Sequence, residues 1–145
     1  MAKPRRDQEH LGIDSNVLVA YLVPEHPHHQ LTRSLEEEMH AVNPTVILET
    51  YHTCVYRLNR RADETARTLV DYMDNSLCLA LDPKTAEFGL TLALKYSIGG
   101  RDALMLASYA LAKQVRRVVT MDKSLLAIRE LKVGRKNLRI NSLSE

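Results

Sequence analysis

Short apolar runs alternate with segments of helical spacing along the chain, and this alternation limits the possible folds more than any other feature. Strand-like runs lie at residues 10–14, 77–81, 117–121 and 138–143, the last expected at an edge of the sheet. Helical patterns cover residues 15–22, 28–40, 43–60, 63–74, 83–96, 102–113 and 123–131. Strands that alternate with helices predict an α/β domain with a short, mostly parallel sheet and helices on both faces.

The length and composition fit one such domain. The 145 residues leave little room for a second domain, and the apolar content of 45% is enough for a core. We expect a basic tail at residues 1–9 and the folded domain at residues 10–145. No run approaches the roughly 18–20 apolar residues that span a bilayer, and no apolar segment follows the basic start. A cytoplasmic protein with no membrane partner is therefore expected.

Charge and cysteine content exclude some classes of site. The formal net charge of +2 does not indicate a nucleic-acid binder. Basic residues gather at 57–61 and at 129–139. Each group could bind nucleic acid, but a solvated surface explains it equally well. Cys54 and Cys78 form no C-x-x-C pair, which argues against a structural zinc site.

Two aspartates directly follow apolar strand-like runs. Asp14 comes after Leu11-Gly12-Ile13, and Asp122 comes after the run at residues 118–121. The carboxyl ends of parallel strands share one edge of a sheet, where ligands of open α/β sheets bind. If both strands are central, the two carboxylates meet there. Each aspartate could equally well cap the helix that follows it.

Two further acids lie on expected helices. Asp102 occupies the first turn of the most apolar helix, with Leu106 and Ala110 on its face, so its carboxylate is expected to point toward protein or a cleft and not toward open water. An unpaired buried charge is costly, and Arg101 or the backbone could satisfy it. Glu49 lies opposite the apolar stripe of its helix and, taken alone, is typical of a solvated surface acid.

The four carboxylates together indicate a metal site. Two like charges about 5 Å apart repel by ~3 kcal/mol at an effective dielectric of about 20, so a crowded set tends to protonate, separate or bind cations. Carboxylate oxygens suit Mg²⁺ or Mn²⁺. The sequence has no phosphate-binding G-x-x-x-x-G-K-[ST] or G-x-G-x-x-G loop. The histidines at positions 26, 28 and 29 flank Pro27 in a loop and lack the spacing of metal ligands, so we do not expect them to bind metal.

These motifs, in this order, resemble the PIN domain family and in particular the VapC-type toxin ribonucleases. The resemblance runs over residues 11–128. The matching segments are residues 12–22 (GIDSNVLVAYL), 25–29 (EHPHH), 44–49 (PTVILE), 101–107 (RDALMLA) and 120–122 (TMD). Some relatives have a further acid soon after the last motif, where this chain has Lys123-Ser124-Leu125.

The resemblance implies a sheet of order 3-2-1-4-5 and a divalent-metal site for RNA phosphodiester hydrolysis. Asp14 and Asp102 would be the main metal ligands, with Glu49 and Asp122 as further or supporting ligands. The amide of Asn16 and the hydroxyl of Thr120 would orient water or ligands. It also implies a homodimer and a small antitoxin protein as partner.

Two other functions remain open on the sequence. A PIN-like scaffold could bind RNA or protein without cutting, and loss of one acid would favour it, but all four acids are present. A phosphatase or phosphotransferase could use Asp14 as its nucleophile. Such enzymes have a second acid two residues later, where this chain has Asn16.

Overall fold

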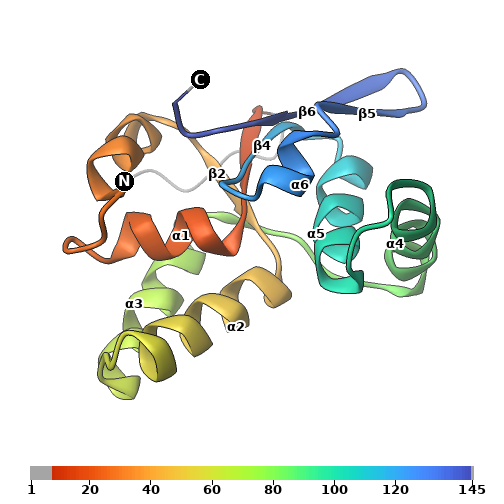
Figure 1. Cartoon of the computed structure of the whole chain (residues 1–145). Helices are drawn as coiled ribbons and strands as arrows, with labels where there is room; N and C mark the ends of the chain where they lie inside the picture. The colour runs from red at the N-terminus through yellow and green to blue at the C-terminus, as the bar shows by residue number, and fades with distance from the viewer. Residues whose placement is uncertain (1–7, 145) are drawn as a thin grey trace.

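The computed structural model describes residues 8–144, so the tail predicted at residues 1–9 lies outside the described residues except for its last two positions. A six-stranded sheet forms the centre, in the order β3-β2-β1-β4-β6-β5 (Figure 1). Its strands are β1 His10–Ile13, β2 His40–Val42, β3 Leu77–Cys78, β4 Val115–Val119, β5 Glu130–Val133 and β6 Lys136–Asn141. All neighbours pair in parallel except β5 and β6, which form an antiparallel hairpin. The predicted α/β class with a mostly parallel sheet is confirmed.

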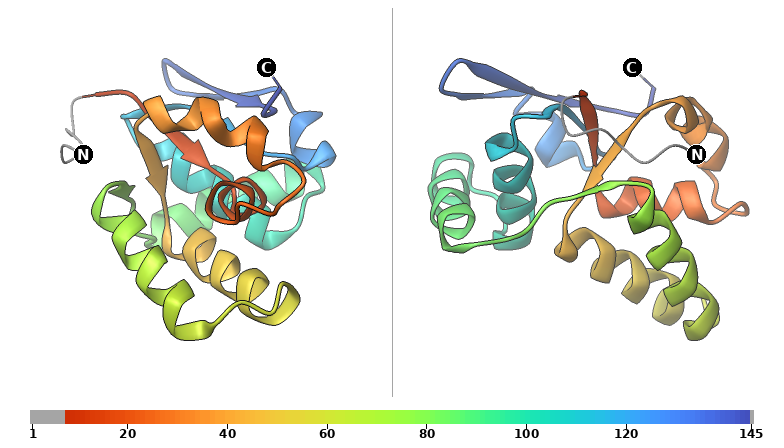
Figure 2. Two further views of the ribbon diagram at one scale, coloured as in Figure 1. Left: turned by 90° about the vertical axis from the view of Figure 1, so that its left-hand side faces the viewer. Right: turned by 180° about the vertical axis from the view of Figure 1, so that it is seen from behind.

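Helices connect the strands and flank the sheet (Figure 2). The α-helices are α1 Ser15–Leu22, α2 Pro44–His52, α3 Ala62–Asp74, α4 Pro83–Tyr96, α5 Gly100–Leu111 and α6 Lys123–Leu126. Two further helical segments are the 3₁₀-helix η1 His29–Glu37 and the π-helix η2 Thr53–Arg57. Within residues 8–144, no helix combines the length and the apolar character that crossing a bilayer requires.

The structure corrects the predicted helix at residues 28–40. Its first part is the 3₁₀ segment η1, and the chain then turns into β2, a strand between β1 and β3 that the pattern did not show. All three residues of β2 are buried, so the strand lacks the alternation of apolar and polar residues that marks a half-buried strand. The predicted helix at residues 43–60 is also divided, because α2 ends at His52 and η2 follows.

The C-terminal part of the sheet differs from the prediction as well. The helix expected at residues 123–131 ends at Leu126, and Glu130–Val133 forms the edge strand β5. The strand expected at the edge is β6, which lies between β4 and β5. Gly134 supplies the positive φ of +60° in the hairpin turn, which a glycine adopts without strain. The order from β3 to β6 otherwise follows the expected 3-2-1-4-5 arrangement.

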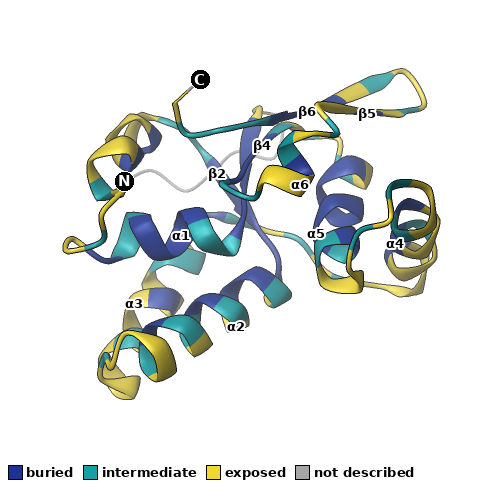
Figure 3. Ribbon diagram, in the orientation of Figure 1, coloured by how far each residue is buried: buried dark blue, intermediate teal, exposed yellow. Residues whose placement is uncertain are grey.

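The part of the core that positions the site lies between the sheet and α5. Seven of the twelve residues of α5 are buried, as its apolar sequence predicted (Figure 3). Tyr109 is fully buried against Gly12 of β1, and a Cβ at position 12 would stand 2.8 Å from the Tyr109 ring. The Tyr109 hydroxyl donates a 2.6 Å hydrogen bond to the carbonyl of Ile13. This packing fixes the helix that carries Asp102 against the strand that leads to Asp14.

Candidate active site

Asp14 is a buried carboxylate at the carboxyl end of β1. It caps α1 by accepting a 2.7 Å hydrogen bond from the Ser15 amide, and its other oxygen accepts a 2.6 Å bond from the Thr120 hydroxyl. Only 6% of the surface of this residue is exposed to solvent. Burial raises the pKa of Asp14 to about 6; the two hydrogen bonds oppose the rise, and the charges of Asp102 and Glu49 add to it. Capping alone does not account for this environment.

Asp122 follows β4, the parallel neighbour of β1, and Ile13 pairs with Val119 in register. Asp122 caps the short helix α6 by accepting bonds of 2.8 and 2.6 Å from the amide and hydroxyl of Ser124. Its own amide donates a 3.0 Å bond to the Thr120 hydroxyl oxygen. The Thr120 hydroxyl therefore links the turns after β1 and β4. The two strand-end acids lie at the same edge of the sheet, as their positions in the sequence predicted.

Asn16 joins the same two turns from the other direction. Its side-chain oxygen accepts a 3.2 Å hydrogen bond from the Met121 amide. The contact holds the segment that carries Asp122 against the first turn of α1. Asn16 thus positions the backbone at Met121. Among the described residues, it forms no hydrogen bond with any of the four acids.

Asp102 lies half-buried in the first turn of α5. Its pKa is raised, first by burial and then by the charges of Asp122 and Glu49, and the neighbouring Arg101 partly offsets this rise. Within residues 8–144, no side chain donates a hydrogen bond to the Asp102 carboxylate or forms an ion pair with it. The first turn of α5 attracts a negative charge by at most ~1–2 kcal/mol, so much of the burial cost remains.

Glu49 is less exposed than an isolated surface acid, because α2 brings it beside α1 and α5. Its side chain is 30% exposed and pairs with Arg101 at 3.9 Å. One carboxylate oxygen accepts a 3.0 Å hydrogen bond from the Ser15 hydroxyl. The orientation of Glu49 is therefore set by the residue that follows Asp14 and by the residue that precedes Asp102.

The four acids, hereafter the acid cluster (Asp14, Glu49, Asp102 and Asp122), share one electrostatic neighbourhood. The charges of Glu49 and Asp102 act on Asp14, and those of Glu49 and Asp122 act on Asp102. In the described part of the chain, no three side chains of His, Cys, Asp or Glu stand close enough together to share a metal ion. The donor chemistry nevertheless fits Mg²⁺, which is commonly held by one or two carboxylates and several waters.

Sequence analysis named Thr120 but did not identify the contacts of Glu49 with Ser15 and Arg101. Ser15 and Arg101 adjoin Asp14 and Asp102 in the chain, and this adjacency is the only sequence signal for them. A third contact joins the buried side chains of Asn43 and Ser108, whose Nδ2 and hydroxyl oxygen lie 2.7 Å apart. Since Asn43 also caps α2, this bond ties the start of the Glu49 helix to the Asp102 helix.

Comparison with known proteins agrees with this architecture. The sequence profile described as "PIN domain" matches residues 12–131. No curated protein matches the sequence significantly. Among solved structures, the chain is similar to Mycobacterium tuberculosis VapC20, described as a sarcin-ricin loop cleaving toxin, with a TM-score of 0.69 and 15% identity over 85% of this chain and 98% of that one.

Two toxin–antitoxin assemblies are similar as well. DNA-bound VapBC from Salmonella typhimurium has a TM-score of 0.66 and 11% identity, over 94% of this chain and 99% of that one. FitAB bound to an IR36 DNA fragment has a TM-score of 0.69 and 14% identity, over 93% and 96% of the two chains. At these identities the likeness concerns the fold. Because the family profile covers most of the chain and all four acids, the chain belongs to the PIN domain family.

Proposed function

We propose that this protein is a Mg²⁺- or Mn²⁺-dependent endoribonuclease and the toxin of a toxin–antitoxin pair. The observation that carries the proposal is the environment of Asp14. A carboxylate at the shared edge of β1 and β4 is buried, its pKa is raised to about 6, and Glu49 and Asp102 repel it. A divalent cation would relieve this repulsion and is the counterion that the donor set favours.

Each acid has a distinct supporting arrangement. The Asp14 and Asp102 carboxylates would hold the cation, because one is buried and the other lacks a protein partner among the described residues. The Thr120 hydroxyl keeps Asp14 in place, and the hydroxyl of the neighbouring Ser15 holds Glu49 close to it. When bound, the cation would lower the pKa of a water and polarise the phosphate.

Asp14 does not need another side chain to take its proton before it can bind a cation. With a pKa of about 6 it is largely ionised at neutral pH, and a bound cation favours the ionised form further. Asp122 is occupied by the Ser124 amide and hydroxyl, so it supports the site by holding the turn after β4 while keeping its second oxygen available for water.

The similar proteins support a proposal for the substrate and for the partner. VapC20 is described as cleaving the sarcin-ricin loop, and several similar structures are toxin–antitoxin complexes. We infer a structured RNA substrate and a small antitoxin that binds this chain. Co-purification tests the partner: candidate small proteins encoded beside this one, acidic or DNA-binding, are expressed together with it. The antitoxin should then inhibit RNA cleavage at equimolar concentration.

A cleavage assay tests the central proposal. Wild-type protein should cut one or more of several labelled, structured RNAs when Mg²⁺ or Mn²⁺ is added and should be inactive in EDTA. Asp14→Asn should reduce cleavage at least ~100-fold, a loss of about 2.7 kcal/mol of transition-state stabilisation. Asp71→Asn, at an exposed position of α3, is the matched control and should cleave like wild type.

The two remaining functions give different results in the same assay. RNA that binds without being cut under any metal condition would support the scaffold. Hydrolysis of a phosphomonoester, with RNA left intact, would support a phosphatase that uses Asp14 as its nucleophile. Equal cleavage by wild type and Asp14→Asn would show that the activity does not depend on Asp14, as expected of a contaminating nuclease, and would contradict the proposal.

We also propose that the protein forms a homodimer. Leu90 and Leu94, one turn apart on α4, are 67% and 85% exposed, and large apolar side chains grouped on a surface are typical of an interface. Light scattering should give twice the chain mass of 16.5 kDa. Leu94→Lys should shift this equilibrium toward the monomer, whereas a strict monomer of wild type at high concentration would contradict the proposal.

A further inference from the structure

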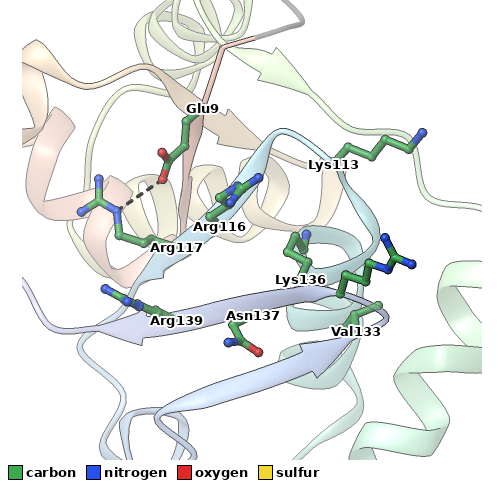
Figure 4. Close-up of a pocket in the computed structure, with 9 residues that line it drawn as sticks. Glu9, Lys113, Arg116, Arg117, Val133, Lys136, Asn137 and Arg139 are labelled. Carbon is green, nitrogen blue, oxygen red and sulfur yellow. Dashed lines mark ion pairs between the residues drawn. The ribbon is translucent and has the colours of Figure 1, made fainter.

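A basic groove lies away from the acid cluster, at the amino ends of β4 and β6 (Figure 4). Its volume is about 850 Å³. Its cationic lining consists of Lys113, Arg116, Arg117, Arg135, Lys136 and Arg139. Glu9 is the single acidic side chain among the residues that line it. A chain with a formal net charge of only +2 thus concentrates six cations at one place.

Two of these cations already have protein partners. Arg117 donates hydrogen bonds of 3.1 and 2.7 Å to the Glu38 carboxylate and lies 3.9 Å from Glu9. The Lys136 ammonium donates to three backbone carbonyls between residues 109 and 115, at 2.6 to 3.1 Å. The hydrogen bonds of Arg117 and Lys136 hold these two side chains in place, and those of Lys136 join the end of α5 to the start of β4. They are not the side chains that remain available to a ligand.

The other four cations have no such partners. Within residues 8–144, no carboxylate pairs with Lys113, Arg116, Arg135 or Arg139, and all four are exposed. Figure 4 shows Arg116 and Lys113 on the side of β4, opposite Arg139 on β6. The register places Arg139 directly beside Arg117. Cations that face one groove concentrate positive potential there and attract a polyanion.

The groove is separate from the acid cluster. Arg117 of β4 precedes Thr120, the residue directly after this strand, by three positions, and extended chain rises about 3.3 Å per residue, so roughly 10 Å lies between them. The acids follow the carboxyl ends of β1 and β4, whereas the groove lies at the amino end of β4. A ligand in the groove therefore does not need to contact the acids, and substitutions in the groove leave the acid cluster intact.

We propose that the basic groove binds the phosphodiester backbone of RNA, at a segment remote from the bond that is cut. The choice of RNA rests on the proposed function. The lining chemistry supports a backbone ligand over an acidic peptide, because Val133 is the only apolar side chain among the lining residues. Peptide and protein partners commonly add aromatic or apolar anchors in pockets to their charged contacts, whereas guanidinium groups recognise phosphates through paired hydrogen bonds alone.

RNA binding without cleavage tests this proposal. The affinity of full-length protein for a labelled, structured RNA is measured in EDTA across a KCl series. Arg116→Gln/Arg139→Gln should weaken binding about tenfold or more and should reduce the slope of log K against log salt by about 1.4–1.8, because two phosphate contacts are lost. Arg116→Lys/Arg139→Lys keeps both charges and should retain most of the slope. Arg57→Gln/Arg67→Gln removes two exposed arginines elsewhere and should bind like wild type.

The outcomes separate this proposal from the proposed function. In the cleavage assay, the groove variant should raise KM with little change in kcat, because the acid cluster is untouched. If Asp14→Asn loses cleavage but the groove variant binds with wild-type affinity and slope, the groove proposal is wrong and the nuclease stands. If RNA binding depends on the groove but no RNA is cut, the groove proposal stands and the nuclease fails. Groove-dependent binding of poly-glutamate with none of RNA would overturn it in favour of an acidic protein partner.

Discussion

The hydroxyl of Thr120 donates a 2.6 Å hydrogen bond to Oδ2 of Asp14, and the two residues are 106 positions apart in the chain. The bond joins the ends of the two central strands. It also favours the ionised form of Asp14 and so opposes the burial that raises the pKa of this carboxyl to about 6. Thr120 therefore helps to decide whether Asp14 is charged near neutral pH.

Removal of this hydroxyl should raise the pKa of Asp14 further. A hydrogen bond to a charged group contributes about 1.5–3 kcal/mol, so Thr120→Val should raise the pKa by about 1–2 units. The measurement is a pH titration of the Asp14 side-chain carboxyl carbon by NMR, without metal. Thr120→Ser retains the donor and should titrate like wild type. Equal midpoints for the Val and Ser variants would show that the hydroxyl does not act on Asp14.

The stability of the metal-free protein should fall as the pH rises through 6. Asp14 has a pKa of 3.8 in the unfolded chain and about 6 in the fold, so below 3.8 it is protonated in both states and contributes nothing. Above 6 the fold must hold a buried carboxylate, and the full cost of about 3 kcal/mol is present. The loss thus develops between pH 4 and pH 7.

Asp14→Asn removes this cost but also alters one of the two hydrogen bonds that Asp14 accepts. We therefore expect the variant to have a free energy of unfolding about 1–3 kcal/mol above that of wild type at pH 8, and the difference to shrink toward pH 4. Urea denaturation at several pH values, in EDTA, measures it. A difference between the two proteins that is the same at pH 4 and pH 8 would contradict the raised pKa.

Mg²⁺ should stabilise the folded protein through Asp102. A ligand present at 100 times its Kd adds about 2.7 kcal/mol, which raises the Tm of a domain of this size by several degrees. Asp102→Asn should lose most of this shift while its metal-free form stays as stable as wild type or becomes more stable, because its carboxylate has no partner among the described residues. Thermal unfolding with and without Mg²⁺ measures both effects.

A second pair of experiments decides whether Asp102 has a structural role instead. If Asp102 serves as a helix cap, the substitution should destabilise the metal-free protein by about 1 kcal/mol or more, and Mg²⁺ should shift both Tm values equally. Asp71→Asn removes an exposed acid from α3 and should show the full wild-type response to Mg²⁺. An equal response in all three proteins would remove Asp102 from the metal site.

The bond between Asn43 and Ser108 should couple the two helices that carry Glu49 and Asp102. Asn43→Ala removes the cap of α2 and should cost about 1–2 kcal/mol of stability, whereas Ser108→Ala leaves the buried Asn43 amide without one partner and should cost about 1–3 kcal/mol. A double-mutant cycle should give a coupling energy of about 0.5–1.5 kcal/mol. Additive costs would show that the contact carries no coupling.

The sequence by itself determined the features that depend on local pattern. The alternation of apolar runs and helical segments predicted the α/β class, and the apolar stretch after Asp102 predicted that α5 is buried. The positions of Asp14 and Asp122 directly after strands predicted that both lie at one edge of the sheet. These predictions hold because side-chain periodicity and strand ends are properties of neighbouring residues.

Only the tertiary structure decided the features that depend on distant segments. The strand β2 has three residues, all buried, and only its pairing with β1 and β3 makes it a strand. The same holds for β5, which is a strand because β6 folds back on it. Glu49 has a solvated position on its own helix and acquires its contacts only where α2 meets Ser15 and Arg101.

The chemistry of the acids was decided in the same way. Residue type and order are visible in the sequence, but the pKa of Asp14 depends on burial and on a hydroxyl 106 residues away. The basic groove likewise joins the end of α5, β4 and the β5–β6 hairpin, and in the sequence its cations look like solvated faces. Charge and burial are properties of the assembled surroundings, because desolvation and Coulomb energy depend on which segments the fold brings together.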